Sequence, residues 1–369
     1  MNRLFRWDQM GLFLLALAAG ILPFAVPEVC AAALREGLTL CSGPLLLSLF
    51  PFLVVSRLLI QCPESDLLAL PFRLAAWGIG IRTPCAARVL CIGFLGGFAP
   101  AASAAAQAVR TGQLTAEEAD ALLPACICSG PSFVVLTVGQ SLLGSAELGV
   151  LLFASQITAN YLTAALLNRF AGVRSVKPGS AVPAFPAPPR LDEILADAAI
   201  TYCKLCGFIL FFRMLAAGAG ALLPAGAGTL CAILLEVCSG CDLASRTGRW
   251  GSLLCCAALS VQGLSVLLQV RTICPPEMTL RPLYRARMLH LPLSLALFYL
   301  LLPGGEADVF STLPVRVLLM RRVPPDCALL VFAVCCMAAC TLRSGIRQVE
   351  QKQMARNAGG CCINSKTLL

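Results

Sequence analysis

The sequence predicts an all-α polytopic membrane protein, and its composition, its apolar runs and the distribution of its basic residues all favour that class. Hydrophobic residues make up 58% of the 369 residues and charged residues only 13%, with a mean hydropathy of +0.83. A soluble domain of this length needs more charge to cover its surface. Apolar runs long enough to cross a bilayer recur along the chain. We therefore expect the lipid bilayer to be a partner and a cell membrane to be the location.

Several other classes of protein are disfavoured. The net charge is +9, but the basic residues are scattered over many loops and form no block with interleaved aromatic residues, so nucleic-acid binding is not expected. His290 is the single histidine, which excludes a multi-histidine metal site. Cys203/Cys206 and Cys238/Cys241 leave a zinc or redox pair open, although close helix packing explains them more simply. No P-loop, nucleophile-elbow or HExxH signature occurs, so we expect no enzyme, cofactor or metal site.

The chain divides into six parts. Residues 1–37 hold a first transmembrane helix and a loop, 38–168 a first repeat, and 169–199 a basic, proline-rich linker with a short amphipathic segment. Residues 200–302 hold a second repeat, 303–342 a loop and the last helix, and 343–369 a basic tail expected to be disordered. About eight transmembrane helices are expected, at 10–26, 38–60, 115–143, 148–167, 200–223, 251–270, 286–302 and 326–342.

Two further apolar segments are rich in small residues and carry a break at their centre. Residues 84–110 are broken at 96–100, and residues 226–246 at 238–240. Such segments are typical of re-entrant hairpins, which enter and leave the membrane on one side. Two of the expected spans are also interrupted, at 129–132 and 260–263. Thr115 with Glu118 forms a capping box that predicts a helix start just before the first interrupted span.

The distribution of charge supports this topology. With the N-terminus inside, the inner side carries nineteen Lys and Arg residues, the outer side six, and the spans and hairpins three. Each half then reads as span, hairpin, interrupted span and span, in opposite orientations. Inverted repeats with discontinuous helices are a recurring transporter design, with the substrate near the midplane.

The four breaks define the candidate site. Half-helix N-termini suit carboxylates, and hairpin carbonyls and hydroxyls suit a coupling cation, Na⁺ or H⁺. Glu236 is an ionisable group at membrane depth that could bind a coupling ion or pair with Arg213 or Lys204, and Arg88 and Arg213 are charge partners that could face an anionic solute. The candidate substrate-binding residues are Gly96, Gly97, Ser103, Ser129, Gly130, Pro131, Ser132, Glu236, Ser239, Gly240, Ser260, Gln262 and Gly263. Structural packing by the small residues, and ion pairs for the charged ones, are the alternatives.

Several motifs resemble a known family. They are the runs at 93–100 (GFLGGFAP), 110–119 (RTGQLTAEEA), 128–133 (CSGPSF), 235–240 (LEVCSG), 263–269 (GLSVLLQ) and 287–290 (RMLH). Together they resemble the nucleoside-recognition (Gate) region of the YlbJ-type sporulation integral membrane proteins, over roughly residues 40–300. The family has two asparagines where this chain has Ile127 and Cys128.

The resemblance implies an architecture like that of concentrative nucleoside transporters. It also implies transport of dipicolinate across the outer forespore membrane of an endospore-forming bacterium. We expect a secondary transporter of a small anionic metabolite that works by alternating access. A non-transporting assembly protein of the spore envelope, a nucleoside-type transporter and an intramembrane enzyme are the alternatives, and a homo-oligomer is left open.

Overall fold

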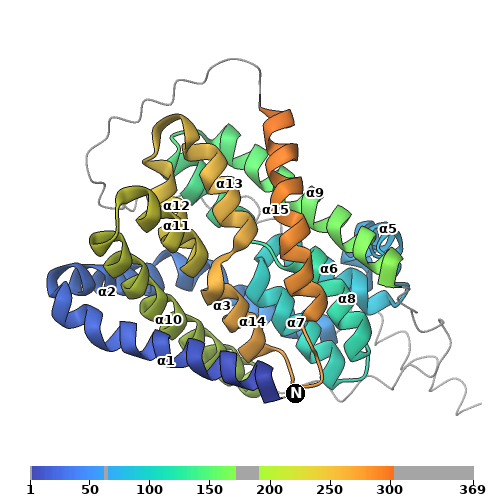
Figure 1. Cartoon of the computed structure of the whole chain (residues 1–369). Helices are drawn as coiled ribbons and strands as arrows, with labels where there is room; N and C mark the ends of the chain where they lie inside the picture. The colour runs from blue at the N-terminus through green and yellow to red at the C-terminus, as the bar shows by residue number, and fades with distance from the viewer. Residues whose placement is uncertain (1, 62–64, 172–190, 303–369) are drawn as a thin grey trace, which may run out of the picture.

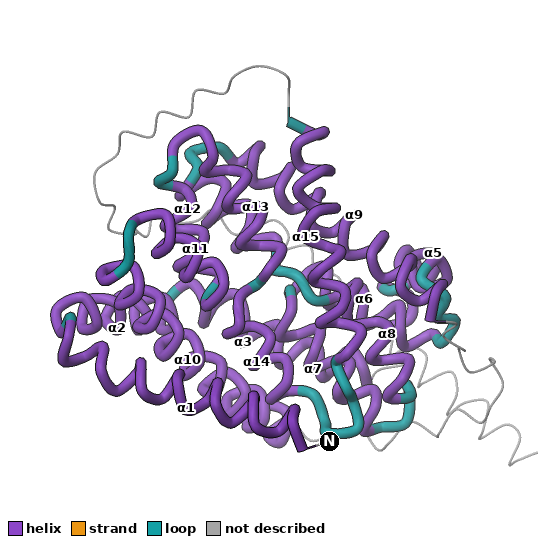
Figure 2. Tube along the Cα trace, in the orientation of Figure 1, coloured by secondary structure: helices purple, strands orange, loops and turns teal. Residues whose placement is uncertain are grey.

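The computed structural model describes residues 2–61, 65–171 and 191–302, and within them every regular element is a helix (Figure 2). In the first half the helices are α1 (Asn2–Ala25), α2 (Pro27–Ser42), α3 (Pro44–Gln61), α4 (Ser65–Leu68), α5 (Leu70–Gly78), α6 (Pro84–Gly96), α7 (Phe98–Arg110), α8 (Ala116–Cys126), the π-helix η1 (Ser132–Leu142) and α9 (Ala146–Ala171). In the second half they are α10 (Leu191–Leu222), α11 (Ala225–Leu235), α12 (Val237–Ser245), the 3₁₀ turn η2 (Gly248–Trp250), α13 (Gly251–Val261), α14 (Gly263–Ile273) and α15 (Arg281–Leu301). The last predicted span and the tail lie outside the described residues, as does most of the linker.

The predicted membrane class is confirmed in its coarse form. Three helical stretches of the described chain are long and apolar enough to cross a bilayer: Ala146–Ala171, Leu191–Leu222 and Gly248–Ile273. Phe13–Ala25 and Pro27–Ser42 together form a fourth candidate, bent by 109° at the junction. Figure 1 shows α1 and α2 beside α10, on the opposite side of the molecule from α5.

The helix α9 shows why this fold suits lipid. Its buried face mixes small and apolar residues with polar side chains, of which Gln156, Asn160 and Thr163 are almost fully enclosed by the protein. Its outer face carries exposed apolar side chains such as Leu162 and Phe170. Polar side chains turned inward and apolar ones turned outward are the reverse of the pattern in water, and lipid is the solvent in which this arrangement is favourable.

The capping box begins α8 as the sequence predicts. The Thr115 hydroxyl accepts a hydrogen bond from the Glu118 backbone N–H at 3.1 Å, and the Glu118 carboxylate accepts one from the Thr115 N–H at 3.2 Å. Two otherwise unpaired backbone donors of the first turn are thereby satisfied.

Each segment predicted as a hairpin folds as two short helices that pack against each other. α6 and α7 form the first and are joined at Gly97, and α11 and α12 form the second and are joined at Glu236. Both predicted interruptions also occur: α8 ends at Cys126 before η1 begins at Ser132, and α13 and α14 meet at Gln262.

Three boundaries differ from the sequence prediction. The segment 191–199 and the span 200–223 form one continuous helix, α10, because neither Gly nor Pro separates them. The span expected at 38–60 is divided at Gly43, so that α3 begins only at Pro44. The second hairpin turns at Glu236 rather than at 238–240, because the Glu236 side chain caps α12, and Ser239 and Gly240 belong to its first turns.

Candidate solute-binding pocket

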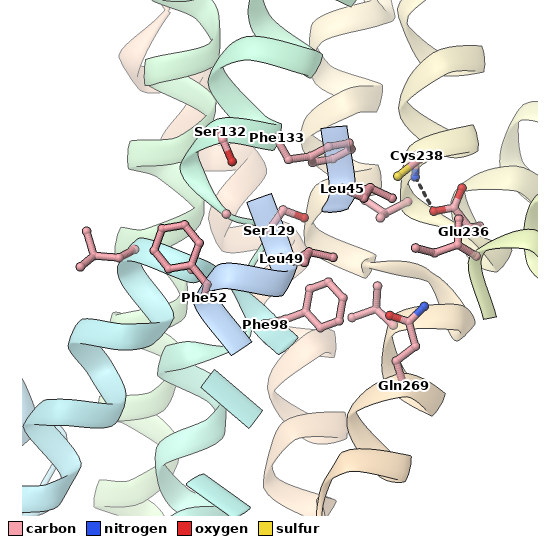
Figure 3. A pocket seen from close by; sticks show the side chains of 16 residues that line it. Leu45, Leu49, Phe52, Phe98, Ser129, Ser132, Phe133, Glu236, Cys238 and Gln269 are labelled. Carbon is pink, nitrogen blue, oxygen red and sulfur yellow. Dashed lines mark hydrogen bonds between the residues drawn. The ribbon is translucent and has the colours of Figure 1, made fainter. Parts of the chain in front are cut away.

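A pocket lies at the centre of the described helices, where the two halves of the chain meet. It leaves about 650 Å³ of empty space, part of it open to solvent. The first half contributes Leu45, Leu49 and Phe52 from α3, Leu95, Gly96 and Phe98 from the α6–α7 turn, and Ser129, Gly130, Ser132 and Phe133 from the α8–η1 interruption. The second half contributes Ile209 from α10, Glu236, Val237 and Cys238 from the α11–α12 turn, and Val266 and Gln269 from α14. Figure 3 shows the serines on one side of this pocket and Glu236 and Gln269 on the other.

The first hairpin turn lies directly against the first interruption. Gly97 has φ 80° and ψ −163°, a conformation that side-chain-bearing residues rarely adopt. A Cβ added at Gly97 would lie 2.7 Å from the backbone nitrogen of Gly130, closer than real Cβ atoms approach other atoms. The absence of a side chain at Gly97 therefore lets the two breaks touch through their backbones.

The second half repeats this contact. Gln262 and Gly263, between α13 and α14, both have positive φ, 63° and 70°. A Cβ added at Gly263 would lie 2.8 Å from the backbone nitrogen of Glu236, which is the turn of the second hairpin. In each half, a hairpin turn thus rests on the interruption of the following broken helix.

Glu236 is the ionisable side chain closest to this second contact and is 2% exposed. Its carboxylate accepts hydrogen bonds from the backbone N–H groups of Cys238, at 2.8 Å, and Ser239, at 2.7 Å, and from the Ser239 hydroxyl at 2.9 Å. These contacts satisfy the N-terminus of α12 and place negative charge at its positive end. The contact with Cys238 is drawn in Figure 3.

The lining combines aromatic surface with a few polar groups. The rings of Phe52, Phe98 and Phe133 supply apolar, flat surface, and Ser129, Ser132 and Gln269 supply hydrogen-bonding groups. The first residues of α7, η1 and α12 also line the pocket, so three helix N-termini face it. Among the described residues, Glu236 is the one charged member of the lining, and no described Lys or Arg contributes to it.

Five of the predicted site residues line the pocket: Gly96, Ser129, Gly130, Ser132 and Glu236. The other predicted site residues lie next to the pocket or elsewhere in the helices. Gly97, Pro131, Gln262 and Gly263 belong to the breaks behind it, and Ser239 binds Glu236. Gly240 packs against Ile233, Ser103 lies buried in α7, and Ser260 lies buried in α13.

Neither predicted charge partner reaches the pocket. Arg88 donates hydrogen bonds to the Ile60 carbonyl at 2.8 Å and to Gln113 at 2.9 Å, and pairs with Asp66 at 3.1 Å. Arg213 pairs with Glu36 at 2.6 Å rather than with Glu236. Both arginines are held by other partners, which explains why neither guanidinium lines the pocket.

Sequence reasoning missed two important residues. Gln269 lies two turns inside α14, is 2% exposed and has a carbonyl oxygen without a hydrogen-bond partner in the described chain. Arg287 was assigned to the inner end of a span, but it is 7% exposed in the middle of the helices. Gln269 lies in the run at 263–269 and Arg287 in the run at 287–290, so the runs that carry the sequence resemblance were the available signal.

Arg287 belongs to a second polar cluster, on the far side of the interruptions. It donates hydrogen bonds to the carbonyl oxygens of Ser260, at 3.3 Å, and of Ile127. One turn further along α15, the His290 ring contacts the Gln156 carbonyl at 3.2 Å, and the Gln156 amide donates to Ser260 at 3.0 Å. In the described part of the chain, no group of three or more His, Cys, Asp or Glu side chains is placed to hold a metal ion.

Comparison with family models, with curated proteins and with solved structures gives no match to this chain.

Proposed function

We propose that this protein is a secondary transporter that carries a small planar solute through a membrane by alternating access, with dipicolinate as the first candidate. The observation that carries the proposal is the pocket itself. Two hairpin turns and two helix interruptions, far apart in the sequence, converge there, and both halves of the chain supply its lining. Discontinuous helices that meet around a central site are the arrangement from which secondary transporters build substrate sites.

The order of elements supports an inverted-repeat architecture. In the first half α3 is followed by the hairpin α6–α7, the broken helix α8–η1 and the span α9. In the second half α10 is followed by the hairpin α11–α12, the broken helix α13–α14 and the span α15. On this proposal the hairpins are re-entrant, about eight helices cross the membrane, and one repeat rocks against the other.

Labelling of introduced cysteines tests this topology. The hairpin ends are marked by the variants Arg82→Cys and Thr111→Cys for the first hairpin, and Pro224→Cys and Thr247→Cys for the second. Labelling is measured as the increase over the parent chain, which has cysteines of its own such as the exposed Cys203. A membrane-impermeant maleimide applied from outside is expected to add label at the second pair only, and at the first pair after permeabilisation. Labelling of both pairs from the same side, or of the two ends of one hairpin from opposite sides, contradicts the inverted repeat.

The pocket lining suggests how the solute is recognised. A planar ring fits between phenylalanine side chains, and serine hydroxyls and the Gln269 amide bind its polar edge. Glu236 repels a dicarboxylate because both carry negative charge and the Glu236 side chain is only 2% exposed to screening by water. An anion therefore enters with a compensating positive charge, and on this proposal the coupling cation, Na⁺ or H⁺, supplies it beside Glu236.

Uptake into proteoliposomes tests this function. The vesicles contain Tb³⁺, whose luminescence rises when dipicolinate binds it. Wild type is expected to give uptake that increases with an inward proton gradient, and Glu236→Gln to lose that increase. Glu118→Gln is the matched control, since Glu118 is also 2% exposed and also caps a helix but lies outside the pocket. Absence of uptake by wild type supports the non-transporting assembly protein instead.

A neutral nucleoside is the second candidate solute. The absence of Lys and Arg from the lining favours it, because a neutral solute needs no cationic partner. Radiolabelled uridine in the same vesicles separates the two candidates. Uptake of uridine that dipicolinate does not inhibit assigns the pocket to nucleosides. For either solute, Gln269→Ala is expected to raise KM, whereas Gln107→Ala, outside the lining, is the matched control.

A further inference from the structure

Arg287 is a charged side chain in the interior of the protein with no carboxylate bound to it in the described chain. Its partners are two backbone carbonyl oxygens, one from each half. Ile127 follows the last residue of α8, and Ser260 is the penultimate residue of α13. The guanidinium therefore bridges the ends of the two half-helices that precede the interruptions.

These carbonyls are the negative ends of two helices. The last carbonyls of a helix have no intrahelical donor and carry partial negative charge. In transporters with discontinuous helices, such carbonyls coordinate the Na⁺ or H⁺ that drives transport. Arginine stays protonated under all ordinary conditions, so its guanidinium brings a permanent positive charge to this position.

We propose that Arg287 is a tethered cation that occupies the position of a coupling alkali ion, so that this carrier runs without sodium. The inference rests on the proposed transport function, and it narrows the ion that drives transport from Na⁺ or H⁺ to H⁺. It also assigns a structural role, because the same guanidinium holds the two broken helices together. Removal of Arg287 is then expected to open a site for Na⁺.

The neighbouring groups supply ligands for that ion. The Asn160 amide nitrogen donates to the same Ile127 carbonyl at 3.3 Å, which places its side-chain oxygen nearby, and that oxygen has no hydrogen-bond partner in the described chain. Both polar atoms of the Gln262 side chain, two residues beyond Ser260, are also buried without partners there. Carbonyl and amide oxygens are the ligand type that hard cations such as Na⁺ prefer.

The test is the thermal stability of the purified, detergent-solubilised full-length chain in NaCl compared with choline chloride, since this readout needs no substrate. Wild type and Arg287→Lys, which keeps a tethered cation, are expected to melt at the same temperature in both salts. Arg287→Ala is expected to be less stable in choline and to regain more than about 2 °C in NaCl, as a bound ion stabilises the folded state. Arg213→Ala is the matched control, because its partner Glu36 is an exposed carboxylate, and it is expected to show no sodium effect.

Sodium-specific stabilisation of wild type or of Arg287→Lys overturns the proposal, and so does an Arg287→Ala protein that folds and ignores sodium. If Arg287→Ala does not fold, wild type and Arg287→Lys still decide the question. Uptake in sodium-free buffer gives a second reading: wild-type uptake is expected to change less than about twofold when choline replaces Na⁺. If wild type shows no uptake, while its melting temperature ignores sodium and that of Arg287→Ala rises in NaCl, the transport function is refuted but the role of Arg287 as a tethered substitute for an alkali ion stands.

Discussion

The contact between Gly97 and Gly130 gives the sharpest prediction. In Gly97→Ala the new methyl group meets two obstacles. The backbone at φ 80° and ψ −163° is strained for any residue other than glycine, at a cost of about 1–3 kcal/mol. The Cβ would also lie 2.7 Å from the Gly130 nitrogen and 3.0 Å from its Cα, and such overpacking costs about 1–3 kcal/mol. We expect Gly97→Ala to lose about 2–6 kcal/mol of stability in total.

Gly144→Ala separates the two effects. Gly144 also has a positive φ, 75°, but a Cβ there would meet nothing within 4 Å, so only the backbone strain remains. With an unfolding entropy of about 2.1 cal/mol/K per residue, each kcal/mol corresponds to about 1–2 °C in a chain of this length. Gly97→Ala is therefore expected to melt about 1–6 °C below Gly144→Ala in the same detergent. Equal melting temperatures for the two variants would refute the claim that the first hairpin turn and the first interruption touch through their backbones.

Two further predictions concern helix ends outside the pocket. Thr115→Ala removes the cap of α8, so we expect a loss of about 1 kcal/mol, measured as a lower melting temperature, whereas Thr115→Ser should keep most of the stability. Asp120→Ala leaves the backbone N–H groups of Thr279 and Leu280 without the carboxylate that binds them at 2.8 and 3.1 Å, and each unpaired group costs about 1–3 kcal/mol. The Asp120 carboxylate connects α8 to the loop before α15, so the backbone amides of Thr279 and Leu280 are expected to exchange hydrogen faster in Asp120→Ala than in wild type. Unchanged exchange at these two amides would contradict the predicted role of Asp120.

The breaks were predictable because their cause is local. Glycine at positions 97 and 263 permits backbone conformations that interrupt a helix, and the capping box at Thr115 specifies a helix start through side chains three residues apart. The turn at Glu236 was placed too late because Ser239 and Gly240 resemble a breaker. The carboxylate that caps α12 decides the turn, and a Glu in an apolar run gives no such signal on its own.

The two polar clusters were only partly predictable because they depend on contacts between distant segments. Arg287 lies in the second turn of α15, where a basic residue near the end of a span normally reaches the membrane surface. It is buried because α8 and α13 both end beside it, and the sequence gives no sign of that meeting. The sequence left ion pairs open for Arg88 and Arg213 but could not name the partners for the corresponding reason, since Asp66 and Glu36 lie close to them only in the folded chain.

The sequence by itself determined the apolar surroundings, the helical class and three of the four helix breaks, since hydropathy, glycine conformations and caps act within a few residues. The tertiary structure alone decided which breaks touch, which polar groups share a pocket, and where each arginine finds its partner. Those outcomes depend on helix packing across more than a hundred residues of chain, as in the 160 residues between Ile127 and Arg287. No local sequence pattern specifies which residues so far apart along the chain come into contact.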